Sequence, residues 1–381
     1  MRLLIVSTLD SDEPFGAYTR PFYLGMYLAQ HFKVCQLGLN CSNVNYAAAV
    51  SVNHRSLGTY VKAIKEQISS FQPDIIYAQE TLPGTAALLA CRLGFQKQPA
   101  LVFDFHTLSA NEYWTRLSTS KDRLQEFKQF VKTYIAQGVL VASGKPVIAA
   151  GTPVVQDIQD WYGVQSDRIH CVKNGVPEDL LTDSNQTEDP FSALRPAKVV
   201  VAIAPKTFQF PSNDMSAEMT VDIAKQLEDH TEEIHFVIVG RTAKDVQAQQ
   251  IPRNLSFTGF LPGRQDFVTH LQHADIGLLP FPKEAVAGGA RNKALDYLAC
   301  GNLVVSTPEG IRGLEDFHDQ QHLLVAEDDV GAIAHTLLEA CRNLATYRQL
   351  RDTASQRVRQ DYSWKAMADR LADILRTVPS R

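Results

Sequence analysis

The densest group of residues able to do chemistry lies in a loop and an expected helix near residue 290. Gly288 and Gly289 come first, Arg291 and Lys293 follow in the first helical turn, and Asp296 lies five residues after Arg291, which is over one turn along the helix. Cations are electrostatically unfavourable at a helix N-terminus, so two of them beside paired glycines indicate a compensating anion. A diphosphate fits, with the cations binding its oxygens and the carboxylate accepting both hydroxyls of a ribose. The alternative is a charged helix start exposed to solvent.

Other candidates follow expected strands, where ligands of open parallel sheets bind. His106 ends the segment ALVFDFH, and its imidazole could hydrogen-bond a sugar hydroxyl, act as acid or base, or have only a structural role. Gly16 follows the first strand and would let a phosphate or sugar approach backbone amides, or would simply form a turn. Arg20, one turn later, would face a cleft or pair at the surface.

The elements that must position these residues follow a regular rhythm. Short apolar runs alternate with longer amphipathic stretches, which is typical of a parallel sheet with helices on both faces. We expect two doubly wound, Rossmann-like α/β domains, at residues 1–180 and 198–360, joined by a polar linker at about 180–197. Their two sheets would face a central cleft. Residues 361–381 are expected to form a helix that packs back on the N-terminal domain.

Length and composition exclude several classes of protein. The 381 residues (42.3 kDa) exceed what one core usually organises, and 45% hydrophobic with 21% charged residues is a globular composition. Acidic residues outnumber basic ones in both halves, and the net charge of −5 disfavours a nucleic-acid binder. Six scattered cysteines are expected to be buried thiols in a reducing cytoplasm. No secretion signal or membrane span is predicted.

Several strings, taken in order and with their spacing, resemble a known family over nearly the whole chain. They are FDFH, VKNGVPEDLL, NLSFTGFLPG, ADIGLLPF, GGARNKALDYLACGNLVVST and YSWKAMADRL. Together they resemble the GT-B glycosyltransferases of family 4. The resemblance implies a retaining transferase that takes a nucleotide-diphosphate sugar, needs no metal or other cofactor, and builds polysaccharides or glycolipids. Its C-terminal domain would bind the donor, and its N-terminal domain would hold the acceptor.

The resemblance also assigns roles in the N-terminal half. The string FDFH places His106 where the family has a histidine near the transferred sugar. The string KNGV matches the family's Pro-Asn-Gly-Val turn, which makes Asn174 and Gly175 a mainly structural turn that lines the cleft.

In the C-terminal half the resemblance concerns the donor. Arg291 and Lys293 would stabilise the departing diphosphate. Asp296 stands where a glutamate normally binds the ribose. Phe260 and Leu261, in the string FTGF and just after it, would border the base.

The chain departs from the family pattern at two donor contacts. Gly288 stands where the family's two-glutamate signature has its first glutamate, as in members that read Gly-Ser-Gly-Thr-Arg-Leu-Lys in this loop. The usual Gly-Arg after the first strand of the second domain is replaced by AIAPKTFQFPSND, where Lys206 is a candidate substitute for the arginine. We therefore keep two alternatives: a nucleotide-sugar epimerase or hydrolase on the same fold, and a binding protein without turnover. The sequence offers the epimerase no carboxylate partner for His106 in the loop at Gly288.

A helix expected at residues 120–137 raises the question of a membrane. One face carries large apolar side chains, and lysines border it: Leu124, Phe127, Val131, Tyr134 and Ile135, with Lys121, Lys128 and Lys132. The ordinary interpretation buries the apolar face on the sheet. The alternative is a basic ridge that makes weak, salt-sensitive contact with anionic headgroups at the inner face of a membrane. The acceptor, a glycan, a lipid or a small molecule, is left open.

Overall fold

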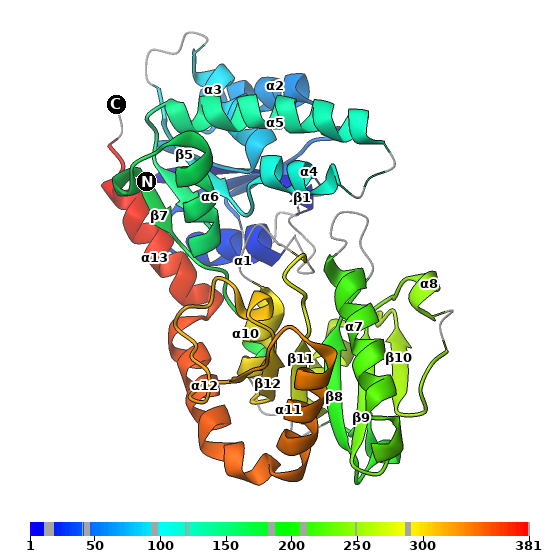
Figure 1. Cartoon of the computed structure of the whole chain (residues 1–381). Helices are drawn as coiled ribbons and strands as arrows, with labels where there is room; N and C mark the ends of the chain where they lie inside the picture. The colour runs from blue at the N-terminus through cyan, green and yellow to red at the C-terminus, as the bar shows by residue number, and fades with distance from the viewer. Residues whose placement is uncertain are drawn as a thin grey trace. The chain divides into compact units, whose positions relative to one another are not determined.

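The computed structural model describes residues 1–10, 19–39, 41, 46–92, 98–118, 120, 122–181, 187–205, 212–247, 250–285 and 291–379. The chain forms two compact units, each built on a parallel sheet (Figure 1). Unit 1 comprises Met1–Gly175 with Trp364–Arg381, and unit 2 comprises Val176–Ala287 with Arg291–Ser363.

The sheet of unit 1 has seven strands in the order β3-β2-β1-β4-β5-β6-β7, and every neighbouring pair is parallel. The strands are β1 (Arg2–Asp10), β2 (Lys33–Leu39), β3 (Ala48–Ser51), β4 (Ile75–Gln79), β5 (Ala100–Phe105), β6 (Val147–Ala149) and β7 (Ile169–Cys171). The order reverses direction at β1, next to β4. Ligands of doubly wound sheets bind at such a point, beyond the carboxyl ends of the strands.

Helices cover both faces of this sheet. They are α1 (Thr19–Leu28), α2 (Leu57–Ser70), α3 (Thr81–Arg92), α4 (Ser109–Arg116), α5 (Arg123–Ala142), α6 (Thr152–Tyr162), the 3-10 turn η2 (Ser166–Arg168) and α13 (Trp364–Thr377). Along β1, Leu4 and Val6 point into the core beneath α2 and α3, while Leu3 and Ile5 point into the core beneath α1 and α13. Burial on both faces explains why the strands are continuous apolar runs.

Helix α13 closes one of these cores from the far end of the chain. Trp364, Met367, Leu371 and Leu375 are buried at helical spacing and pack with residues of α1. Figure 1 shows α13 (red) beside α1 (blue), although they come from opposite ends of the sequence.

The outward face of α5 corrects an expectation. Leu124 is 64% exposed and Ile135 59%, and Phe127 and Tyr134 are exposed as well. The interpretation that buried this apolar face on the sheet is therefore wrong. Helix α5 packs against α3, α4 and α6 instead, with buried residues on its opposite side: Gln137, Leu140 and Val141. Lys121 lies outside the described residues.

The sheet of unit 2 has six parallel strands in the order β10-β9-β8-β11-β12-β13. The strands are β8 (Lys198–Ile203), β9 (Ile234–Val239), β10 (Leu255–Gly259), β11 (Ile276–Leu279), β12 (Leu303–Ser306) and β13 (Leu324–Val325). The helices are α7 (Ser212–Gln226), α8 (Lys244–Gln247), α9 (Arg264–His273), α10 (Asn292–Ala299), α11 (Val330–Arg342) and α12 (Arg348–Asp361), with the 3-10 turns η3 (Glu178–Leu180), η4 (Ser192–Leu194), η5 (Glu228–His230), η6 (Glu309–Ile311) and η7 (Leu344–Tyr347).

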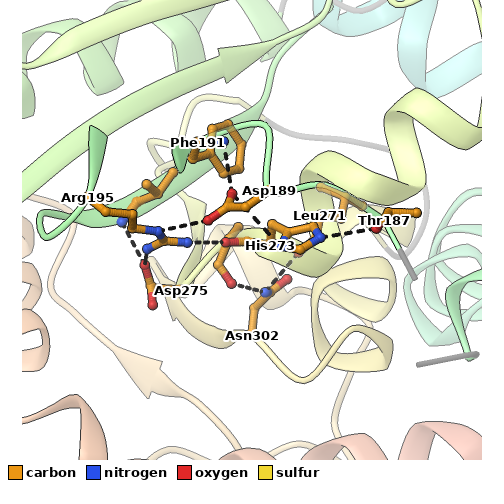
Figure 2. Close-up of polar contacts among 10 residues, drawn as sticks. Thr187, Asp189, Phe191, Arg195, Leu271, His273, Asp275 and Asn302 are labelled. Carbon is orange, nitrogen blue, oxygen red and sulfur yellow. Dashed lines mark hydrogen bonds and ion pairs between the residues drawn. The ribbon is translucent and has the colours of Figure 1, made fainter. Parts of the chain in front are cut away.

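The polar segment before β8 is fixed to unit 2 by ionic contacts. The Arg195 guanidinium lies 3.1 Å from an Asp189 oxygen, donates to the Asp275 carboxylate, and donates to the His273 carbonyl at 2.8 Å (Figure 2). Residues 187–197 therefore belong to the body of unit 2. Residues 182–186 of the expected linker lie outside the described residues.

The cysteines are only partly as expected. Cys35, Cys91 and Cys341 are buried in the two units. The expectation of burial is wrong for Cys171, which is exposed because it ends β7, the short edge strand of its sheet.

Candidate active site

His106 directly follows β5, at the carboxyl edge of the sheet of unit 1. Its side chain is only 14% exposed. Burial lowers the pKa of His106 to about 4, so the imidazole is neutral at physiological pH. A neutral ring can both donate and accept a hydrogen bond, as contact with a sugar hydroxyl requires.

Glu80, which the sequence analysis missed, supplies a carboxyl group beside this ring. It follows β4, the neighbour of β5, and its Oε1 accepts a hydrogen bond from the backbone N–H of His106 at 2.9 Å. The same oxygen lies 3.5 Å from the ring Nδ1 of His106. The signal was present in DIIYAQE, an apolar strand that ends in an acid, but only the pairing of β4 with β5 joins it to His106.

Arg20 neither faces a cleft nor pairs at the surface, because it forms a buried ion pair. It is 3% exposed, and its Nε donates to an Asp104 oxygen at 3.0 Å. The same carboxylate also accepts from Arg20 Nη2 at 3.3 Å and from the hydroxyl of Tyr77. A buried charge is tolerated when it is paired and hydrogen-bonded in this way.

The same arginine holds the turn after β7. Its Nη1 donates to the carbonyls of Val172 and Lys173 and, at 3.1 Å, to the side-chain oxygen of Asn174. The next residue, Gly175, lies so close to α13 that a Cβ there would be 2.7 Å from the backbone of Trp364. The turn therefore needs glycine for close packing.

In unit 2, Arg291 immediately precedes α10 and already has an anionic partner. Its Nη2 donates to Glu309 Oε1 at 3.0 Å, its Nε donates to the Glu309 carbonyl at 3.1 Å, and Nη2 also donates to the Ala285 carbonyl. The guanidinium lies 3.6 Å from the ring centre of Phe281. The compensating anion inferred from the two cations is thus provided for Arg291 by the protein itself. That anion is Glu309, which no sequence pattern indicated.

Lys293 and Asp296 lie less than one helical turn apart on α10. The Nζ of Lys293 donates to the side-chain oxygen of Asn213 at 2.6 Å. Burial, with the nearby charge of Arg291, lowers the pKa of Lys293 to about 7, and burial raises the pKa of Asp296 to about 7. Both groups therefore change charge near neutral pH, which is common for residues that bind a charged ligand.

Helix α10 is held at this edge by one close approach. Gly277 of β11 faces the Tyr297 ring, where a Cβ would lie 2.3 Å from the ring carbon Cγ. The Tyr297 hydroxyl accepts a hydrogen bond from the backbone N–H of Ile203 in β8 at 2.7 Å. Because α10 follows β11 along the chain, its first turn lies at the carboxyl edge of the unit 2 sheet.

Phe260 and Leu261 come directly after β10, at the same edge of the sheet. Phe260 is 67% exposed, and the Arg241 guanidinium lies 5.4 Å from its ring centre. An exposed aromatic ring in this position is able to stack on a flat base.

Four predicted donor residues lie outside the described residues: Gly16, Lys206, Gly288 and Gly289. Within the described part of the chain, no group of three or more His, Cys, Asp or Glu side chains is arranged to hold a metal ion.

Two family models match the chain. The model described as "Glycosyltransferase Family 4" matches residues 47–180, and the model described as "Glycosyl transferases group 1" matches residues 207–343. The chain belongs to glycosyltransferase family 4. The family assignment made from the sequence is confirmed, and this family 4 member is a glycosyltransferase.

Solved structures show the fold of this family 4 glycosyltransferase. Sucrose-phosphate synthase from Thermosynechococcus elongatus is 14% identical, with a TM-score of 0.76 over 98% of each chain. HepE from Anabaena, in complex with UDP-glucose, is 13% identical, with a TM-score of 0.73 over 99% of this chain and 100% of that one. WaaG, a glycosyltransferase of lipopolysaccharide biosynthesis, is 14% identical, with a TM-score of 0.67 over 98% and 100%. The predicted GT-B fold is confirmed. No curated protein matches the sequence.

Proposed function

We propose that this glycosyltransferase moves a hexose from a UDP-sugar to an acceptor hydroxyl, with retention of configuration and without a metal ion. The observation that carries the proposal is the pair of Lys293 and Asp296 on the first turns of α10. Lys293 would bind the diphosphate, and Asp296 would accept the ribose hydroxyls. The UDP-glucose bound to HepE supports the choice of base and sugar.

In the proposed reaction the protein supplies electrostatic stabilisation and positioning rather than a covalent intermediate. Negative charge grows on the diphosphate as the sugar leaves, and the charged form of Lys293 would stabilise it. Exposed Phe260 would stack on the uracil. His106 would hydrogen-bond the transferred sugar and hold it for attack by the acceptor.

Assays with UDP-glucose and other UDP, GDP and ADP sugars test this function. Thermal shift should be largest with the UDP compounds, because bound ligand stabilises the folded state by mass action. Transfer should require an acceptor and should continue in EDTA. Interconversion of donors without an acceptor would show an epimerase, donor cleavage to free sugar would show a hydrolase, and a thermal shift without any product would show a binding protein.

His106→Ala is expected to lower the rate of transfer by about 10²–10³-fold, because the transferred sugar loses a positioning contact. The melting temperature should change little, since the variant keeps the backbone N–H that donates to Glu80 at 2.9 Å. The measurement is the initial rate at saturating donor, with thermal unfolding as the control. Full activity of His106→Ala, or its gross unfolding, would indicate that His106 has only a structural role.

We also propose that the acceptor is lipid-linked and that the enzyme reaches it through a peripheral contact. The α5 surface consists of exposed apolar side chains and two exposed lysines: Trp114, Leu124, Phe127, Ile135, Val139, Lys128 and Lys132. Aromatic and aliphatic groups flanked by lysines match the apolar and anionic layers of a membrane surface. No helix in the described part of the chain is long and apolar enough to cross a bilayer.

Lys128→Gln with Lys132→Gln is expected to weaken binding to anionic vesicles about tenfold or more at low salt, at about 1 kcal/mol per lysine near the surface. Leu124→Ser with Ile135→Ser should weaken binding at every salt concentration. Vesicle co-sedimentation measures both, and the exposed Lys62→Gln on α2 is the control. Wild-type binding should decline toward 0.15 M salt, where the screening length is about 8 Å. Failure to sediment at low salt would favour a soluble acceptor.

A further inference from the structure

We propose that Glu80 is a positioning residue for His106. It fixes the orientation of the imidazole ring and keeps the ring proton on Nε2. The Nε2–H group then donates a hydrogen bond to an oxygen of the transferred sugar. Only the contact between Nε2–H and the sugar rests on the proposed function. The position of the proton is a property of the protein without ligand and is tested separately.

The first observation is that Glu80 contacts His106 at two points. One carboxyl oxygen accepts from the backbone N–H of His106 at 2.9 Å and lies 3.5 Å from the ring Nδ1. The ring is therefore oriented by the same group that holds its backbone.

The second observation is that Asp104 cannot serve the other ring nitrogen. Its carboxylate already accepts two hydrogen bonds from Arg20 and one from Tyr77. Its nearer oxygen lies 3.9 Å from the Nε2 of His106, which is beyond hydrogen-bond distance. In the described part of the chain Nε2 is buried without a partner, and an unsatisfied buried nitrogen is costly unless a ligand satisfies it.

The third observation is the backbone of Glu80. Its φ is +76°, in the left-handed region that residues with a side chain rarely adopt. Neighbouring strands and helices hold it there, because its N–H donates to the Asp104 carbonyl at 2.7 Å and its carbonyl accepts from the Gly84 N–H at 3.0 Å. A strained conformation kept by its surroundings favours a functional position for the side chain.

The charges around the pair decide where the proton lies. Glu80 faces two other acids, Asp104 of β5 and Glu112 of α4, while the cation near it in the described part of the chain, Arg20 of α1, is paired with Asp104. Burial raises the pKa of Glu80 to about 8 and lowers that of His106 to about 4. At pH 7 both groups are neutral, and the carboxyl O–H is free to donate to Nδ1. The ring proton then lies on Nε2.

Raising the pH should reverse this arrangement. Above pH 8 Glu80 ionises and becomes only an acceptor, so the ring proton moves to Nδ1 and Nε2 becomes an acceptor. Tyr77 of β4 also faces the network, but burial raises its pKa well above its usual value, so it stays neutral through this range.

Nitrogen-15 NMR of ring-labelled histidine in the ligand-free protein tests the proposal. His106 is assigned by the loss of its signals in His106→Gln. We expect the Nε2–H tautomer at pH 7 and a change to the Nδ1–H tautomer above about pH 8. In Glu80→Gln the atom facing the backbone N–H must be the amide oxygen, which can only accept from the ring, so Nδ1–H should be found throughout.

Matched and kinetic controls complete the experiment. Glu112→Gln removes a neighbouring acid without touching the ring and should leave the tautomer at pH 7 unchanged. With donor and acceptor, wild-type kcat should decrease above pH 8, where the ring proton moves to Nδ1. Glu80→Gln should lower kcat about tenfold or more at pH 7, change KM for the donor less than threefold, and show no further decrease above pH 8.

An Nδ1–H tautomer in the wild type at pH 7, or the same tautomer in the wild type and Glu80→Gln, would overturn the inference. If Glu80→Gln does not fold, the pH titration of the wild type alone still shows which ring nitrogen of His106 carries the proton. A correct tautomer without any sugar transfer would leave this inference standing and reject the proposed function.

Discussion

Arg20→Met is expected to lower the free energy of unfolding of unit 1 by about 3–5 kcal/mol, because it leaves the buried carboxylate of Asp104 without its cation. The substitution also removes the hydrogen bonds that hold the turn at Asn174. Urea denaturation followed by tryptophan fluorescence measures the change. The signal is specific, because all three tryptophans of the chain, Trp114, Trp161 and Trp364, belong to unit 1.

Lys62→Met is the matched control for this experiment. It removes an ion pair of the same unit, with Glu66 on α2, in which both side chains are mostly exposed. Exposed pairs contribute little, so the loss should stay below about 1 kcal/mol. An equally small loss for Arg20→Met would show that the buried pair does not stabilise unit 1.

Lys293→Gln is expected to weaken binding of UDP-glucose about 10–100-fold, which corresponds to the loss of one charge-assisted contact of about 1.5–3 kcal/mol. Uridine, which has no diphosphate, should bind equally well to the variant and the wild type. Calorimetry measures both ligands. Lys283→Gln is the control, since Lys283 lies before the same helix but is largely exposed. Equal affinity of Lys293→Gln and wild type for UDP-glucose would place the diphosphate elsewhere.

The same contact predicts a dependence on pH. Without ligand the pKa of Lys293 is about 7, so at pH 8 most of the amine is neutral and a diphosphate must restore its charge. Binding at pH 8 should therefore take up a proton, and affinity should decline as the pH rises further. Calorimetry in two buffers of different ionisation enthalpy measures this uptake, which Lys293→Gln should abolish. Asp296, with a pKa of about 7, is already mostly ionised at pH 8.

Arg291 is a poorer probe of the donor than the sequence indicates. Its guanidinium bonds to Glu309 and to two carbonyls, so Arg291→Ala would remove the cation beside a mostly buried acid and destabilise unit 2. A loss of donor binding in that variant would have two causes. Lys293, which contacts a neutral amide, separates binding from folding more cleanly.

Features that depend only on neighbouring residues could be predicted from the sequence. The alternation of apolar and amphipathic segments was sufficient for two parallel sheets, and the position of His106 after a strand followed from the strand itself. The partners of these residues could not be predicted in the same way. Glu80 meets His106 because β4 pairs with β5, and Arg20 meets Asp104 from a distance of 84 residues in the chain.

The orientation of α5 shows a second limit. Helical spacing correctly grouped Leu124, Phe127 and Ile135 on one face, but spacing does not say what covers a face. The usual assumption, that the apolar side meets the sheet, failed because α5 packs on other helices through Gln137, Leu140 and Val141. Gln137 accepts from the Ala110 N–H and donates to Thr81, so this inner side is polar as well as apolar.

The division of unit 1 between the two ends of the chain has a consequence for its synthesis. Helix α13 covers the core that β1 and α1 share, yet it is synthesised only after the whole of unit 2. At about 5–20 residues per second, the whole of unit 2 is made during an interval on the order of 10–40 s, while Leu3, Ile5 and Leu24 lack their cover. Before α13 is made, the N-terminal half would expose this apolar core and would bind chaperones. A stop codon shortly before Trp364 would therefore destabilise unit 1 more than unit 2.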